Sequence, residues 1–104
     1  MNIFVIGGGG REHALVWKLN QHGHQIFCAP GNPGIAEIAE CVPLQVNQIK
    51  ELADFSESNK IDLTVVGPED PLNNGVVDKL QEIGIPSVGP TKLMSRLETS
   101  KSFT

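Results

Sequence analysis

The chain carries four consecutive glycines, Gly7 to Gly10, directly after a short apolar run and directly before Arg11, Glu12 and His13. A buried strand that ends in glycines and continues into a helix leaves backbone N–H groups exposed at the helix N-terminus. The helix dipole favours an anion at the same place. We therefore predict a phosphate-binding loop, and a tight strand-to-helix turn that binds nothing is the alternative.

These glycines do not match the motifs of the common nucleotide-binding loops. In the two possible frames of the G-x-G-x-x-G fingerprint, the third glycine is replaced by Glu12 or by His13. The carboxylate expected about twenty residues further on is missing, because that position falls within Cys28 to Gly31. No Gly-Lys-Ser/Thr follows the glycines, as a Walker A loop would require. A nicotinamide cofactor and a Walker-type nucleotide site are therefore disfavoured.

The composition is that of an ordinary globular domain, with 104 residues of which 39% are hydrophobic and 19% charged. A net charge of −4 and scattered basic residues argue against a nucleic-acid partner. No apolar run is long enough to cross a membrane and no secretory signal is visible, so we expect a cytoplasmic protein. Cys28 and Cys41 are expected to be reduced thiols, and His22 and His24 to lie in a solvated loop rather than in a metal site.

Short apolar runs alternate with amphipathic patterns, which is typical of a parallel sheet with helices on both faces. Strands are predicted at residues 2–6, 25–29, 42–45, 61–66 and 85–88. Helices are predicted at residues 11–21 and 35–39, from Asn47, from residue 73 or 74, and after Thr91. Gly23 and Gly84 are placed to end two of them. The predicted fold class is α/β, a Rossmann-like doubly wound parallel sheet of about five strands.

Right-handed crossovers, and a third strand that Pro43 confines to the sheet edge, favour the spatial order 3-2-1-4-5. The first and fourth strands are then neighbours whose connections leave in opposite directions. Ligands of open α/β sheets bind beyond the carboxyl ends of the strands at such a switch point. Four turns rich in glycine and proline meet at this edge, at residues 7–10, 30–34, 67–71 and 89–91.

The last predicted helix has no stop signal, since residues 91–104 contain neither glycine nor proline. Its apolar residues Leu93, Met94, Leu97 and Phe103 are expected to form a surface that frays or is covered by a second copy of the chain. We therefore expect residues 1–104 to be one N-terminal domain, truncated in its last helix.

Together, the motifs at the four turns resemble those of the phosphoribosylamine glycine ligase family, also called glycinamide ribonucleotide synthetase. The motifs are G-G-G-G-R-E-H-A-L at residues 7–15, A-P-G-N-P-G at 29–34, D-L-T-V-V-G-P-E-D-P-L at 62–72, and G-P-T-K at 89–92 with L-E-T-S-K at 97–101. The similarity covers essentially the whole chain. It implies the pre-ATP-grasp domain of an ATP-grasp enzyme that joins phosphoribosylamine to glycine in purine biosynthesis.

The resemblance also implies that different domains of the enzyme bind different molecules. ATP and Mg²⁺ or Mn²⁺ would be bound by ATP-grasp and C-terminal domains that are absent here, so this chain would hold no catalytic residue, no cofactor and no metal. Its partners would be phosphoribosylamine and glycine as small-molecule substrates and the remaining domains of the same enzyme, with no nucleic acid and no membrane.

At the matching positions, the resemblance implies that the backbone amides of Gly8, Gly9 and Gly10 hold the sugar 5′-phosphate. Arg11 would neutralise this phosphate, with a solvated side chain as the alternative. His13 would line the site, with capping of a neighbouring loop or packing on the sheet as the alternative. Glu12 is interpreted as a partner of the helix dipole rather than as a ligand group.

A second wall of the site would consist of Pro30, Gly31 and Asn32, with the Asn32 amide turned either to the substrate or to its own backbone. The third part would be the turn formed by Gly67, Pro68 and Glu69. The Glu69 carboxylate would accept hydrogen bonds from the ribose hydroxyls, because a carboxylate can accept two parallel bonds from a diol. A solvated turn is the alternative for Glu69.

Two other functions stay open. A free-standing sugar-phosphate-binding module should end its last helix with a cap, which residues 91–104 do not provide. A receiver-type interaction domain would need an acidic cluster after the first strand, where the glycines stand. The ligase domain is therefore the favoured interpretation.

Overall fold

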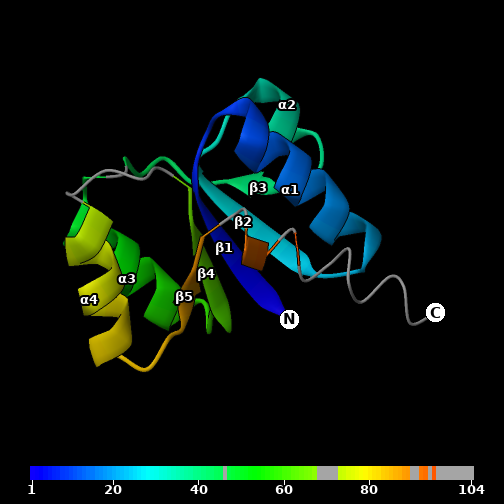
Figure 1. Ribbon diagram of the computed structural model, residues 1–104. Coiled ribbons are helices and arrows are strands. Elements are labelled where there is room, and N and C mark those ends of the chain that lie inside the picture. The colour runs from blue at the N-terminus through cyan, green and yellow to red at the C-terminus, as the bar shows by residue number, and fades with distance from the viewer. Residues whose placement is uncertain (46, 68–72, 90–91, 94, 96–104) are drawn as a thin grey trace.

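The computed structural model of the chain describes residues 1–45, 47–67, 73–89, 92–93 and 95. Its five parallel strands form one sheet in the order β3-β2-β1-β4-β5, which confirms the predicted doubly wound α/β fold (Figure 1). The strands are β1 (Asn2–Gly7), β2 (Gln25–Pro30), β3 (Glu40–Cys41), β4 (Leu63–Val66) and β5 (Ser87–Val88). The helices are α1 (Gly10–Gln21), α2 (Pro33–Ala36), α3 (Ile49–Ser58) and α4 (Asn73–Glu82).

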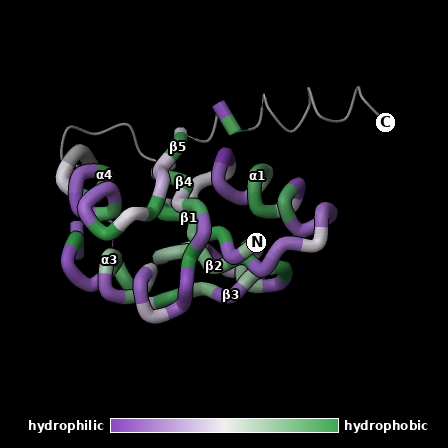
Figure 2. The backbone as a smooth tube through the Cα atoms, turned by 90° about the horizontal axis from the view of Figure 1, so that it is seen from below, coloured by the Kyte–Doolittle hydropathy of each residue, from purple (hydrophilic) through white to green (hydrophobic). Residues whose placement is uncertain are grey.

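The helices cover both faces of the sheet, α1 and α2 one face and α3 and α4 the other (Figure 1). Alternate side chains of β1 point to opposite faces and belong to two cores. Ile3 and Val5 pack in the core on the α1 side, whereas Phe4 and Ile6 pack in the core with α3 and α4. Hydrophobic and hydrophilic stretches alternate along α1, α3 and α4, as expected for helices with one face on a sheet (Figure 2).

The central strand β1 pairs with β2 on one side and with β4 on the other. Gly7 pairs with Pro30, and Ile6 pairs with Val66. The Gly67 N–H donates to the Ile6 carbonyl at 2.8 Å, which extends the second pairing by one residue. The carboxyl ends of three neighbouring strands therefore lie level, and the turns that follow them begin side by side.

Two elements begin earlier than predicted. The third strand is Glu40–Cys41 instead of residues 42–45. Its ladder ends with the bond from the Val42 N–H to the Cys28 carbonyl at 2.7 Å, because Pro43 has no N–H to continue it. The helix predicted at residues 35–39 is α2, which begins at Pro33. A proline is well suited to the first turn of a helix.

Three other boundaries differ as well. Asn47 does not cap α3; the N-cap is Gln48, whose carbonyl accepts from the Leu52 N–H at 2.9 Å. The strands predicted at residues 61–66 and 85–88 are shorter. Ile61 and Ile85 are buried, but their N–H groups donate to Ser56 and Leu80 of the preceding helices instead of to a strand.

Leu93 is buried and packs in the core on the α1 side, so the chain returns over that face after β5. The expectation that Leu93 contributes to an uncovered surface is therefore wrong. Met94, Leu97 and Phe103 lie outside the described residues. No helix of the described part of the chain is long and apolar enough to cross a membrane.

Candidate functional site

The glycine loop leaves the first turn of α1 open. Gly9 is the N-cap residue, with extended backbone angles (φ −86°, ψ −178°) and no side-chain cap. The His13 N–H donates to the Gly9 carbonyl at 3.0 Å and is the first N–H with an acceptor inside the helix, so the N–H groups of Gly10, Arg11 and Glu12 lie before it. Gly9, Gly10 and Arg11 are exposed. The loop therefore presents backbone donors and the positive end of a helix dipole to solvent, as an anion site requires.

The turn after β2 packs directly against this loop. The Gly31 N–H donates to the Gly7 carbonyl at 3.2 Å, and a Cβ added to Gly8 would come within 2.6 Å of the Gly31 carbonyl oxygen. Gly31 itself has φ +73°, a conformation that L side chains rarely adopt. Close contact between the two backbones therefore brings together the glycine loop and the turn after β2, which were predicted to form two walls of the site.

Asn32 joins the two turns through its side-chain amide. Its Nδ2 donates to the Gly8 carbonyl at 2.8 Å, and its Oδ1 accepts from the Ile35 N–H at 2.9 Å as the N-cap of α2. Of the two orientations considered for this amide, the structure has the one directed to backbone. Asn32 thus fixes the position of the glycine loop, and Pro30 beside it is half-buried at the end of β2.

Glu12 lies underneath the glycine loop rather than on the surface. Glu12 is only 8% exposed, although it lies in the first turn of α1 and the residue before it, Arg11, is exposed. A Cβ on Gly7 or Gly67 would overlap its carboxylate, and one on Gly9 would lie 3.3 Å from its Oε2. Sequence reasoning missed this burial. The glycines at the ends of the first and fourth strands, Gly7 and Gly67, could have indicated it, because they leave space for the Glu12 side chain.

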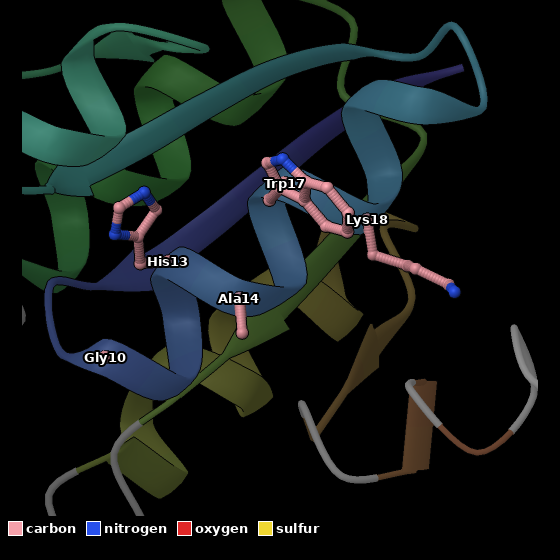
Figure 3. Close-up of a pocket in the computed structure, with 5 residues that line it drawn as sticks. All are labelled: Gly10, His13, Ala14, Trp17 and Lys18. Carbon is pink, nitrogen blue, oxygen red and sulfur yellow. The ribbon is translucent and has the colours of Figure 1, made fainter.

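His13 and Arg11 differ in exposure, since Arg11 is exposed. His13 is half-buried against α2, where a Cβ on Gly34 would come within 2.7 Å of its Cε1. With Gly10, Ala14, Trp17 and Lys18 it lines a groove of about 460 Å³ along α1 (Figure 3). The structure therefore places His13 beside α2 and Arg11 at the surface, and their roles in binding a ligand stay predictions.

The third part of the predicted site is only partly described. Gly67 is buried at the end of β4 and stands over Glu12. Pro68 and Glu69 lie outside the described residues, as do Pro90 and Thr91 of the fourth turn. The structure therefore describes the glycine loop and the turn after β2, whereas the roles of Pro68 and Glu69 stay predictions from the sequence.

The two cysteines lie in register on β2 and β3, next to the loop, and both are free thiols. The Cys28 Sγ donates to the Gly7 carbonyl at 3.2 Å. Burial raises the pKa of Cys28 to about 12, and the nearby Cys41 and Glu12 add to this effect. Cys28 is therefore a neutral structural thiol and not a nucleophile.

The histidine pair lies beyond the C-terminal end of α1, far along the helix from the loop. The ring centroids of His22 and His24 are 6.4 Å apart. Partial burial, the N-terminal amine and His22 all lower the pKa of His24. In the described ranges, no three His, Cys, Asp or Glu side chains gather in a way that could hold a metal ion.

The fold and the site define a Rossmann-like α/β domain with an uncapped helix N-terminus at the switch point between β1 and β4. Two solved UDP-glucose 4-epimerases share this fold over 86% of the chain: one from Stenotrophomonas maltophila, with TM-score 0.68 and 16% identity, and one from Thermotoga maritima, with TM-score 0.71 and 12% identity. The chain covers 36% and 37% of these two proteins, respectively.

Residues 1–98 match the family model described as phosphoribosylglycinamide synthetase, N domain, and the chain belongs to this family. The resemblance in the motifs is thereby confirmed. The curated protein named phosphoribosylamine–glycine ligase from Caldanaerobacter subterraneus subsp. tengcongensis is 50% identical over 105 residues, which are 99% of this chain and 25% of that protein. Its namesake from Pseudomonas putida is 50% identical over 108 residues, which are 100% of this chain and 25% of that protein. The chain thus spans about a quarter of the length of these relatives.

Proposed function

We propose that this chain is the domain that holds the sugar phosphate in an ATP-dependent ligase, which joins phosphoribosylamine to glycine to give glycinamide ribonucleotide in purine biosynthesis. Family membership and the names of the relatives support this function. The observation that carries it is the uncapped N-terminus of α1, which presents backbone donors at the β1–β4 switch point.

In this proposal, the amides of Gly8 to Gly10 and the exposed Arg11 bind the 5′-phosphate. Asn32 holds the loop in place through the Gly8 carbonyl. Gly67, Pro68 and Glu69 serve the ribose, with the Glu69 carboxylate accepting from its hydroxyls. ATP with Mg²⁺ or Mn²⁺ and the acyl-transfer chemistry belong to other parts of the ligase, and the site of action is the cytoplasm.

The proposed site can be tested by removing a single backbone donor. Gly10 is the first residue of α1, where proline is tolerated, and Gly9 before it already has the extended backbone that a following proline prefers. Gly10→Pro therefore deletes one N–H from the loop with little cost to the fold. Gly10→Ala keeps the N–H, and a Cβ there meets nothing within 4 Å, so the difference between the two variants isolates the donor.

The measurement is an NMR titration of the 104-residue chain with ribose 5-phosphate. We expect affinity in the millimolar range, because a few backbone donors and a helix dipole contribute about 1–3 kcal/mol. Amide shifts should concentrate at Gly7 to His13, and Gly10→Pro should bind several-fold more weakly than Gly10→Ala. Shifts confined to His22 and His24, or equal affinities of the two variants, would contradict the proposed site.

A further inference from the structure

The exposed side of α1 carries a tryptophan, a residue type that is mostly covered in folded proteins. Trp17 is 53% exposed, and in the part of the chain that the structure describes Met1 is the other large hydrophobic residue with such an exposure. The neighbouring Ala14 is exposed as well. Tryptophan is enriched at protein interfaces, because burying its large ring contributes more than burying most other side chains. The position of Trp17 therefore indicates a contact surface.

Trp17 stands beside a groove and not on a flat surface. Gly10, Ala14 and Trp17 follow one another at the spacing of helix turns, so they share one side of α1. With His13 and Lys18 they line the groove of about 460 Å³ (Figure 3). Gly10 has no side chain and Ala14 has only a methyl group, which leaves room next to the indole ring. The groove can therefore accept an apolar side chain of a partner.

The path of the chain indicates which partner reaches this groove. Leu93 follows the last strand and packs in the same core as Leu15 and Leu19 of α1. The polypeptide that comes after it therefore continues from the side of the sheet that carries the groove. The chain spans about a quarter of the length of its curated relatives, so most of such a ligase lies outside it.

We propose that the groove beside Trp17 is the docking site of a later domain of the ligase, which places an apolar side chain against the indole ring. The inference rests on the proposed function, because it takes this chain to be the first part of a longer ligase. Docking at this groove buries Trp17. It also fixes the position of α1, whose N-terminus presents the glycine loop, relative to the remaining domains.

A second copy of the chain is the competing occupant, since an exposed tryptophan beside a groove can also drive self-association. The two occupants differ in how protection of Trp17 depends on concentration. A second copy protects Trp17 in the 104-residue chain alone, and more so as the concentration rises. A later domain protects it in the intact ligase at every concentration.

The first experiment measures the oxidation of Trp17 by hydroxyl radicals, with mass spectrometry of the peptide that contains it. The 104-residue chain and the intact ligase that carries it are compared, each at two concentrations. Met1 is the internal control, because it is 61% exposed and does not line the groove. We expect Trp17 to be oxidised about five- to tenfold more slowly in the intact ligase, with the rate of Met1 unchanged.

The second experiment measures amide hydrogen exchange of α1 in the same two proteins, with and without Trp17→Ala. Gln81→Ala is the matched control, because Gln81 is also exposed but lines a different groove, between α4 and β5 on the other face of the sheet. Trp17→Ala should speed exchange of α1 several-fold in the intact ligase and leave it unchanged in the 104-residue chain. Gln81→Ala should change neither.

Equal oxidation of Trp17 in the two proteins would overturn the docking of a later domain. Protection that appears in the 104-residue chain as its concentration rises would do the same, in favour of a second copy. An equal effect of Trp17→Ala on exchange in both proteins would make Trp17 a structural residue of α1 and also overturn the inference. None of these results affects the proposed function, which the titration with ribose 5-phosphate tests separately.

Discussion

At the scale of single residues, two glycines are explained by the side chain that fills the space beside them. Gly7 and Gly67 end neighbouring strands, and the Glu12 carboxylate lies where a Cβ on either would project. Gly67 is not among the residues with positive φ, so its lack of a side chain serves this contact and not an unusual backbone conformation. A carboxylate and two glycines thus form one structural unit at the switch point.

Gly67→Ala should lower the free energy of unfolding by about 1–3 kcal/mol, because Glu12 has to move to admit the methyl group. Gly89→Ala is the matched control, since Gly89 also follows a strand but a Cβ there meets nothing within 4 Å. Urea unfolding of the two variants measures the difference. Equal stabilities of the two would show that Glu12 is not confined, and adding Glu12→Ala should offset most of the cost of Gly67→Ala.

At the scale of elements, the site depends on strands that end at one level and on turns held by backbone contacts. β2 contributes twice, through Cys28 beneath the loop and through the turn that packs on Gly8. The neutral Cys28 thiol donates to the Gly7 carbonyl, so β2 helps to hold the glycine loop in place.

Cys28 should resist alkylation in the folded chain, because burial raises its pKa to about 12. Iodoacetamide at pH 8 should modify Cys28 in the Cys41→Ser variant much more slowly than it modifies Cys41 in the Cys28→Ser variant. The folded state keeps the proton on the Cys28 thiol, whereas the unfolded thiol loses it above about pH 8.5. The stability that comes from burying the neutral thiol is therefore present below that pH and is lost as the pH rises toward 12. Rapid modification of native Cys28 would contradict its burial.

At the scale of the whole molecule, the chain after β5 closes the core on the α1 side. Leu93 packs with residues of β1, β4 and α1 that are far from it in sequence. The domain therefore includes this segment in its hydrophobic core instead of ending at its last strand.

Leu93→Ala should lower the free energy of unfolding by about 2 kcal/mol, since it leaves a cavity in the core on the α1 side. The control is Trp17→Ala, which removes a larger apolar side chain that is 53% exposed. Denaturant unfolding should rank Leu93→Ala as the more destabilising change. The reverse order would mean that Leu93 does not hold the segment against the core.

The 104-residue chain should bind ATP with Mg²⁺ no more tightly than in the millimolar range, because its glycine loop lacks the Walker A lysine and the proposal places the nucleotide elsewhere in the ligase. Isothermal titration calorimetry measures this directly. Micromolar, magnesium-dependent binding would place a nucleotide site in this chain and contradict the proposed division of labour.

The sequence by itself determined the number of strands and their order, and it predicted the edge of the sheet at which a ligand would bind. Hydrophobic periodicity and glycines at element ends are local features, and the handedness of crossovers then leaves few topologies. The burial of Glu12, the two backbone bonds of the Asn32 amide, the position of β3 and the packing of Leu93 were decided only in the tertiary structure. Each of these depends on neighbours that are distant in sequence or on competition for backbone hydrogen bonds, which no local pattern records.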